Sequence, residues 1–234
     1  SMTKLTEKAT GRWLRRALRI VVIAPALVAA ACGAVSQAPE RPESPAAEDD
    51  AGALAFPGAL GHGRHAKGGR GGTLHFVTTL DDSGAGSLRA CIEAEGPRVC
   101  IFRVSGVIRF TTERPLIRNP YLTIAGQTAP GGGVLITHDG GELGLTPIAI
   151  KEAHDVVIRH LRVRPDKLGE RRNSNSGFTI ERSHDIILDH VSASWARDEN
   201  FTTQGDNDNI SVVSSILAKG LKPHDKCALL ASDP

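Results

Sequence analysis

A polar turn followed by a short aliphatic strand recurs four times along this chain of 234 residues. The four strings occupy residues 120–124, 154–158, 184–188 and 208–212. The equivalent aliphatic positions, which are 34, 30 and 24 residues apart, are Leu122, Val156, Ile186 and Ile210. A second series with offsets of 30 and 23 lies between them, at residues 148–150, 178–180 and 201–203. Two strand series in phase with one repeat indicate a coil that contains several strands per turn.

The repeat predicts an all-β solenoid over residues 55–234. Each coil would stack on the preceding one, so that equivalent strands pair in parallel and equivalent side chains form ladders. Unequal offsets then reflect turns of different length between strands that keep their register. A β-sandwich is the alternative for a chain of many short strands. It gives no reason, however, for the same His-Asp-aliphatic string to return at residues 154 and 184.

One short helix is predicted before the first coils, over residues 87–95. Ser83 or Ser87 can cap its N-terminus, and the Gly96-Pro97 pair ends it. Its apolar side chains can face a core. Because the open end of a solenoid exposes apolar strands, we expect this helix to cover the first coil.

The cysteines leave one question open. Cys91 and Cys100 flank the turn at residues 95–97, and either a disulfide or two buried free thiols fits this spacing. Cys227 has no obvious partner. An exported protein can hold a disulfide, because the compartments outside the cytosol are oxidising.

Residues 1–32 have the three parts of a secretory signal peptide. A basic stretch at residues 4–19 precedes twelve apolar residues that end in small side chains. Cys32 follows three alanines, as the lipidated cysteine of a bacterial lipoprotein does. Simple secretion and membrane anchoring through a lipidated Cys32 therefore both stay open. Residues 33–54 are predicted to be a flexible linker, because they are rich in Ala, Pro, Glu and Asp. We expect a secreted, extracellular or periplasmic protein, with an outer-membrane lipoprotein as the variant.

The charge of the chain argues against a nucleic-acid partner. The formal net charge is +2, but residues 1–31 hold six basic groups and one acidic group, which leaves 22 basic and 25 acidic residues in the remainder. A protein that binds nucleic acid needs a basic face. The part of the chain after residue 31 has no such excess of basic residues, so we do not expect a nucleic-acid partner. As a separate expectation, the protein is a monomer.

Six local strings, in a fixed order, resemble the pectate lyase family of polysaccharide lyases. They are residues 55–72, 79–89, 121–133, 157–164, 187–192 and 224–230. The resemblance covers residues 55–234 and implies a right-handed parallel β-helix that acts on an acidic polysaccharide such as pectate. It further implies cleavage by β-elimination, in which calcium and cationic side chains neutralise the sugar carboxylate. The string around Asp189-His190 is typical of the family, and we expect these two side chains to satisfy each other or the backbone rather than bind metal.

The resemblance also implies site residues. Lys226 matches the family's lysine that contacts the substrate carboxylate and is the predicted catalytic group, with His224 as a substrate-binding or positioning residue beside it. Asp198 matches a calcium aspartate, and Glu199 can supply a further oxygen. Two other calcium positions of the family fall on Ser176 and Thr202. Neutral oxygens at these two positions are weaker ligands for a hard cation, so a standard Ca²⁺ site is in doubt.

Arg162 and Arg164 share one face of a predicted strand, where they can bind galacturonate carboxylates or remain solvated. The family's proposed catalytic arginine lies beyond the string that contains Lys226. We therefore expect the β-helix that ends at Pro234 to be incomplete and to lack its base.

Two other functions stay open beside the lyase. One is a non-catalytic β-helix that binds acidic glycans, or an inactive fragment. The other is a hydrolase, for which Asp206 and Asp208 are the candidate carboxylate pair, although their setting is typical of a turn.

Overall fold

The computed structural model describes residues 52–139, 146–165 and 175–231, all within one compact unit, Ala47–Pro234. The predicted signal peptide, Cys32 and residues 33–51 of the predicted linker lie outside the described residues. No helix in the described ranges has the length and apolar character needed to cross a lipid bilayer.

Sixteen strands form three sheets in this part of the chain. Sheet A contains β1 (Thr73–Val77), β2 (Arg98–Phe102), β5 (Leu122–Ala125), β8 (His154–Arg159), β11 (His184–Asp189) and β14 (Asp208–Val213). Sheet B contains β3 (Gly106–Phe110), β6 (Val134–His138), β9 (Arg162–Val163), β12 (Ser192–Ser194) and β15 (Ile216–Ala218). Sheet C contains β4 (Leu116–Ile117), β7 (Ile148–Lys151), β10 (Phe178–Glu181), β13 (Glu199–Gln204) and β16 (Lys226–Leu230).

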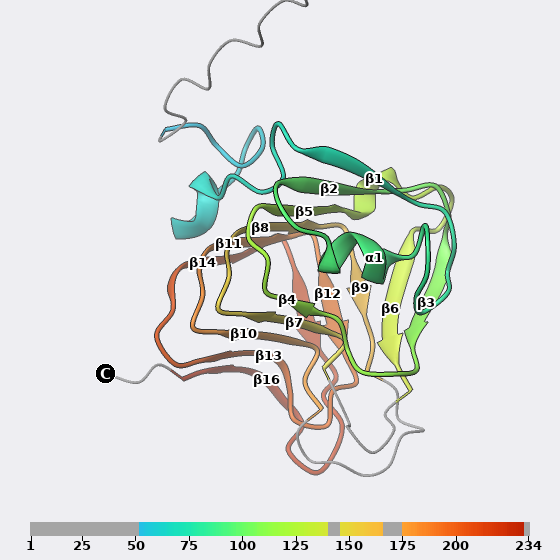
Figure 1. Ribbon diagram of the computed structural model, residues 1–234. Coiled ribbons are helices and arrows are strands. Elements are labelled where there is room, and N and C mark those ends of the chain that lie inside the picture. Colours follow the sequence, from blue (N-terminus) through green and yellow to red (C-terminus); the bar gives the residue numbers. More distant parts are fainter. Residues whose placement is uncertain (1–51, 140–145, 166–174, 232–234) are drawn as a thin grey trace, which may run out of the picture. The chain divides into compact units, whose positions relative to one another are not determined.

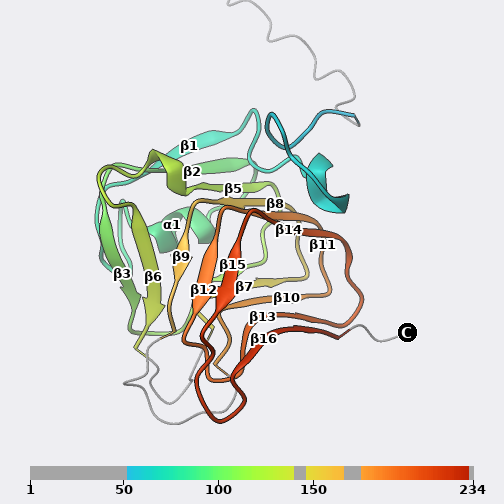
Figure 2. The same ribbon diagram turned by 180° about the vertical axis from the view of Figure 1, so that it is seen from behind.

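The chain visits sheets A, B and C in turn, and every pair of neighbouring strands is parallel. This order gives five described coils, from β2–β3–β4 to β14–β15–β16 (Figure 1). The view from behind shows the strands of sheet B side by side (Figure 2). The predicted parallel β-helix is therefore confirmed.

The register agrees with the sequence repeat residue by residue. Leu122 is paired with Val156, Val156 with Ile186, and Ile186 with Ile210, which are the equivalent positions of the first series. In the second series, Phe178 lies between Ile148 and Phe201. Sheet B was not predicted, because its strands β9 and β12 have only two and three residues and carry little hydrophobic pattern.

Aliphatic ladders from all three sheets form one core. Its fully buried members include Ile124, Ile158 and Leu188 from sheet A, Ile136 from sheet B and Ile180 from sheet C. The inward positions alternate with outward ones along each strand, as the two-residue period of a β-strand requires.

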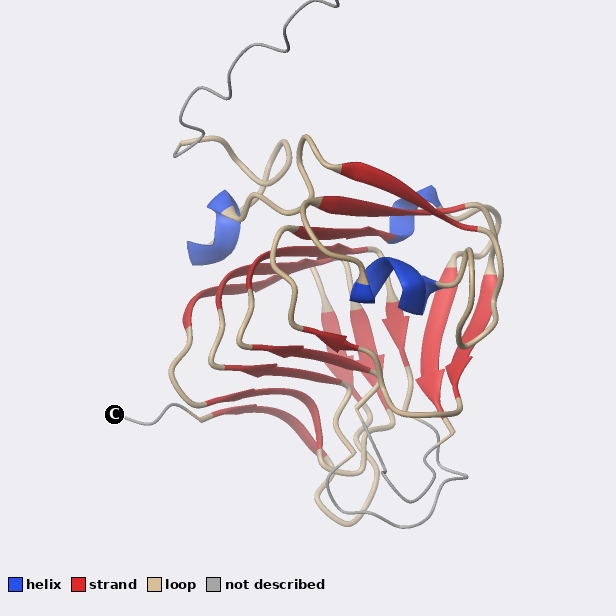
Figure 3. Ribbon diagram, viewed as in Figure 1, coloured by secondary structure: helices blue, strands red, loops and turns tan. Residues whose placement is uncertain are grey.

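The predicted helix covers the first coils. Helix α1 (Leu88–Glu93) is one of the helices drawn in blue in Figure 3. It is capped by Ser87, whose hydroxyl oxygen accepts a hydrogen bond from the Ala90 N–H. Leu88 and Ile92 are buried in the main core. A disulfide joins Cys91 of the helix to Cys100 of β2, which decides between the two states that the spacing left open.

Arg98 binds the backbone at the C-terminal end of this helix. Its side chain is fully buried and donates hydrogen bonds to five backbone carbonyl groups, those of Cys91, Ile92, Gly96, Asn119 and Pro120. Two of these carbonyls belong to the last turns of α1, where backbone acceptors lack partners within the helix. The guanidinium group therefore ties α1 to the turns at both ends of the first coil.

The corners of the coils repeat a left-handed backbone conformation. Asp155, Asp185 and Asn209 have φ of 54, 52 and 52° at one corner of successive coils. At a second corner His160, His190 and Ser214 have φ of 54, 53 and 49°. The first of these ladders uses Asp and Asn, whose short polar side chains tolerate this region best.

The segment before β1 packs on the outer surface of sheet A. It contains the 3₁₀ helix η1 (His62–His65), and a second short 3₁₀ helix, η2 (Gly126–Thr128), follows β5. Ala59 and Ala66 are buried against Val157 and Ile187 of sheet A. Gly63 approaches the strand so closely that a Cβ atom there would lie 2.2 Å from the Ile186 carbonyl oxygen.

Candidate functional site

Four of the predicted site residues meet at the start of β13 and β16 in sheet C. Glu199 and Lys226 are register partners on these strands, and the Lys226 N–H donates to the Asp198 carbonyl oxygen at 3.2 Å. The side chains continue this pairing. His224 Nδ1 lies 2.8 Å from Asp198 Oδ1, and Lys226 Nζ lies 3.3 Å from Glu199 Oε1. We call these four residues the Lys226 cluster.

The two carboxylates of the Lys226 cluster differ in exposure. The Glu199 side chain is 4% exposed, whereas Asp198 and Lys226 are 21% and 53% exposed. Burial raises the pKa of Glu199, and the hydrogen bond and negative charge of Asp198 raise it further, while Lys226 opposes the shift. Lys226 therefore only partly offsets the effects of burial and of Asp198 on the Glu199 carboxylate.

Ser176 precedes β10, next to the start of β13. The neighbouring Gly177 N–H donates to the Glu199 carbonyl oxygen, and the Asn175 carbonyl oxygen accepts from the Arg197 N–H. Ser176 and Asn175 are each 4% exposed. Two buried side-chain oxygens here have no hydrogen-bond partner, Asn175 Oδ1 and Thr202 Oγ1. A buried acceptor without a hydrogen-bond partner destabilises the fold, so the lack of a partner at these two oxygens calls for a structural or functional explanation.

Among the described contacts, the two predicted arginines make none with the Lys226 cluster, and their roles differ. Arg164 donates to the Ser192 carbonyl oxygen and hydroxyl, and its guanidinium carbon lies 5.8 Å from the centre of the Trp195 ring. Trp195 is 49% exposed and stands three residues before Asp198. Arg162 is exposed on β9 and donates to the Gly132 carbonyl oxygen at 2.7 Å.

Other candidates from the sequence take local roles. Asp208 accepts a hydrogen bond from the next residue's N–H, that of Asn209, as a turn residue does. His190 Nδ1 lies 2.8 Å from Asp189 Oδ1, as the sequence predicts.

The pairing within the Lys226 cluster was not predicted, although the sequence holds a signal for it. Glu199 and Lys226 are 27 residues apart, which is within the range of the coil offsets. The offset between these two coils could not be fixed beforehand, because the turns vary in length.

Comparison with known proteins identifies relatives. No protein-family model matches the chain. A probable pectate lyase C of Emericella nidulans is 42% identical over 180 residues, which cover 77% of this chain and 40% of the relative. The protein of the same name from Aspergillus fumigatus is 40% identical over the same shares. The chain is homologous to pectate lyases.

The resemblance to pectate lyases extends to plants. Probable pectate lyase 12 of Arabidopsis thaliana is 32% identical over 149 residues, 59% of this chain and 30% of that protein. Among solved structures, jun a 1, the major allergen from cedar pollen, superposes with a TM-score of 0.48 at 20% identity, over 66% of this chain and 47% of that one. The chain spans about 40% of the length of the pectate lyase C proteins.

Proposed function

We propose that this chain is part of an exported polysaccharide lyase that cleaves pectate or a related uronan by β-elimination. The observation that carries the proposal is the Lys226 cluster, in which a half-exposed ammonium group is held at the edge of sheet C by a buried carboxylate. Homology to pectate lyases supports the same reaction class. Export rests on the signal peptide that residues 1–32 predict, and we propose a monomer.

The β-elimination reaction requires positive charge next to the sugar carboxylate. In β-elimination a base removes the proton next to the sugar carboxylate, the bond to the glycosidic oxygen breaks, and a carbon–carbon double bond forms in the sugar. Negative charge develops on the carboxylate side of the sugar as the proton leaves. Lys226 Nζ can donate hydrogen bonds to that carboxylate, and fixed positive charge lowers the barrier where charge develops. His224, paired with Asp198, positions the loop that leads to Lys226.

The proposed lyase would use a calcium ion beside the Lys226 cluster. Asp198 and Glu199 offer carboxylate oxygens beside each other, and the unpartnered Asn175 Oδ1 offers a neutral one. We propose that these oxygens, with Ser176 nearby, would hold Ca²⁺, which takes several oxygen ligands. When bound, calcium would neutralise sugar carboxylates. The carboxylates are fewer than the family pattern predicts, because Ser176 and Thr202 replace acidic residues.

The test is the product of the reaction on polygalacturonate. A lyase leaves an unsaturated sugar end, which absorbs ultraviolet light. For the whole lyase of which this chain is proposed to be part, we expect absorbance to rise with calcium and to stop when a chelator is added. Reducing ends without a double bond would overturn the proposal in favour of a hydrolase. Binding of polygalacturonate without any product would favour the non-catalytic acidic-glycan-binding β-helix.

A further inference from the structure

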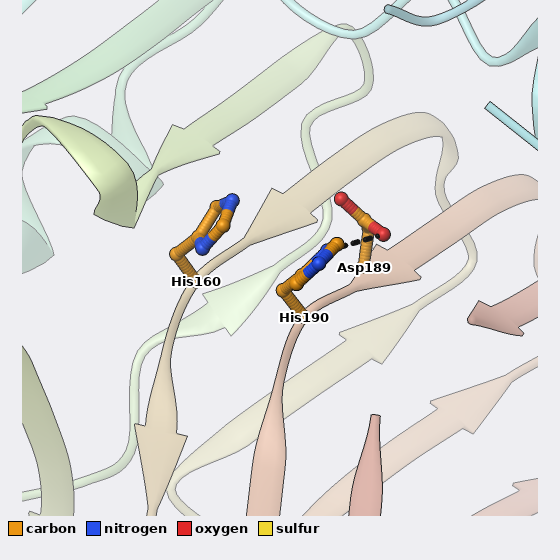
Figure 4. A group of neighbouring side chains, drawn as sticks. All are labelled: His160, Asp189 and His190. Atoms are coloured by element: carbon orange, nitrogen blue, oxygen red, sulfur yellow. Dashed lines mark hydrogen bonds and ion pairs between the residues drawn. The ribbon is translucent and has the colours of Figure 1, made fainter. Parts of the chain in front are cut away.

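A second group of titratable side chains lies at the corner between sheets A and B, outside the Lys226 cluster. His160 follows β8, and Asp189 and His190 end β11 and begin the next corner (Figure 4). One potential ligand atom from each of the three lies within 4.8 Å of the other two. The proposed lyase does not use these residues.

The backbone brings the two imidazole rings face to face. His160 and His190 occupy equivalent corner positions of adjacent coils, and the His160 N–H donates to the Asp189 carbonyl oxygen at 3.0 Å. Both residues have φ near 50°, as given above. Their ring centres are 4.7 Å apart with 18° between the planes. The parallel ladder therefore fixes both histidines side by side without any ligand.

Asp189 orients one of the two rings. Its side chain is 4% exposed, and Oδ2 accepts a hydrogen bond from Arg159 Nε at 2.8 Å and forms an ion pair with Nη2 of the same side chain, also at 2.8 Å. The other oxygen, Oδ1, lies 2.8 Å from His190 Nδ1. A carboxylate oxygen facing Nδ1 favours the tautomer with the proton on that nitrogen, which leaves the lone pair of Nε2 on a ring that is 51% exposed. A carboxylate behind the imidazole is the usual support of a metal-binding histidine.

His160 is suited to act as the second ligand. It lines the same groove as His190, and one of its potential ligand atoms belongs to the group that lies within 4.8 Å of one another. The neutral imidazole ring is a common ligand of divalent transition metal ions.

Space for the ion and its remaining ligands is present. A groove of about 290 Å³ is lined by both histidines together with Arg162, Ser192, Ser214 and the Gly132–Gly133 turn. Two nitrogens bound to one Zn²⁺ at about 2.0–2.1 Å lie closer together than 4.8 Å. The value of 4.8 Å is an upper bound on the separation of the ligand atoms, and the half-exposed His190 ring can tilt into the groove while its Nδ1 stays on Asp189.

We propose that His160 and His190 bind a divalent transition metal ion that prefers imidazole, such as Zn²⁺ or Cu²⁺, with Asp189 as the residue that orients His190. The remaining coordination positions face the groove and are open to water or to an oxygen ligand. Imidazole suits these metals, whereas calcium prefers oxygen, so this site and the calcium site proposed above select different ions.

The test is Zn²⁺ titration of the metal-stripped chain by isothermal calorimetry, with all free thiols alkylated. We expect a saturable site for one ion per chain that becomes at least tenfold weaker in His160→Gln and in His190→Gln. His184→Gln is the matched control, because His184 stacks on His154 at 5.0 Å and contacts Asp185 in the same way. It should bind Zn²⁺ like the wild type.

Three results would overturn the proposal. They are an absence of saturable binding in the wild type, unchanged affinity in both site variants, and an equal loss in His184→Gln. Co²⁺ loading gives a second readout, because its visible spectrum should show nitrogen ligands that disappear in His190→Gln. Circular dichroism verifies that each variant is folded. None of these measurements depends on lyase activity, so failure of this proposal is distinguishable from failure of the proposed function.

Discussion

Lys226 Nζ lies 3.3 Å from Glu199 Oε1 across two paired strands, and the carboxylate is almost completely buried while the ammonium group is half exposed. Asp198 adds a second carboxylate next to Glu199. The Lys226 ammonium group is thus held at the edge of sheet C by its ion pair with Glu199, and it partly neutralises that carboxylate. The same relationship has consequences for stability and for pH.

Removing the lysine should destabilise the fold through the glutamate. We expect Lys226→Met to lower the free energy of unfolding by about 1–2 kcal/mol at neutral pH, a value reduced from that of a fully buried pair because Lys226 is half exposed. Glu199→Gln in the same background should restore most of the loss. Urea unfolding of both single variants and the double variant measures this coupling, and strictly additive effects would contradict it.

Glu199 also predicts a pH dependence. Its native pKa is raised above the ordinary value of 4.5, so the folded chain keeps a proton that the unfolded chain releases. Stability from this group therefore falls as pH rises from 4.5 through the native pKa, and the loss is complete above it. The melting temperature measured across this range should decline less steeply in Glu199→Gln than in the wild type. If the melting temperatures of the two proteins declined in parallel, the pH dependence would not come from Glu199.

For Asp82 we expect a pH dependence of stability with the opposite sign. Burial alone raises the pKa of Asp82, but hydrogen bonds from Arg89, Thr111 and Thr112 outweigh it and lower the pKa to about 2. Its stabilisation is complete above 3.8, the ordinary value, and is lost as pH falls through about 2. We expect Asp82→Asn to cost on the order of 1–2 kcal/mol at neutral pH.

The cost of Asp82→Asn should be smaller near pH 3 than at neutral pH and should disappear below about pH 2. Asp81→Asn is the control, because Asp81 is exposed and its carboxylate contacts only Thr79 among the described hydrogen bonds. Unfolding by urea at neutral pH and near pH 3 compares the two. An equal loss in both variants would show that the buried network around Asp82 adds nothing.

Arg98 should be the most sensitive charged residue in the first coils. Arg98→Met removes a fully buried side chain with five carbonyl partners, and we expect a loss of about 3 kcal/mol or more in unfolding free energy. Arg98→Lys should restore little, since one ammonium group with three donors cannot replace the five hydrogen bonds that Nε, Nη1 and Nη2 of the guanidinium group donate. Arg103→Met, which removes only a contact with the Phe76 ring, is the control. Thermal melts with equal midpoints for Arg98→Met and Arg103→Met would contradict this role.

The sequence was most informative where side chains recur in register. The offsets of Leu122, Val156, Ile186 and Ile210 predicted the strand pairing of sheet A, because a parallel coil must place equivalent residues side by side. The sequence offered Ser83 and Ser87 as caps before an apolar segment, and the structure selects Ser87. The short strands of sheet B were missed, since two or three residues between turns carry no readable period.

The candidate sites were predicted less well, because side-chain contacts depend on turn geometry. The string that holds Lys226 indicated the residue but not its pairing with Glu199. His160 and His190 are 30 residues apart, the same offset as the strands that precede them, so their stacking had a signal that was overlooked. The tautomer and the groove, in contrast, follow only from the positions of Arg159 and Asp189 in space.

The central claim is that the Lys226 cluster binds the carboxylate of an acidic sugar. Its most direct test is the affinity of the chain for a galacturonate oligosaccharide in the presence of calcium, measured by titration calorimetry on Lys226→Met and Lys222→Met. Lys222 lies in the same loop, is 84% exposed and pairs with Asp225, so it controls for net charge. We predict at least tenfold weaker binding for Lys226→Met and a change of less than about threefold for Lys222→Met. Equal affinities for both variants would contradict the claim.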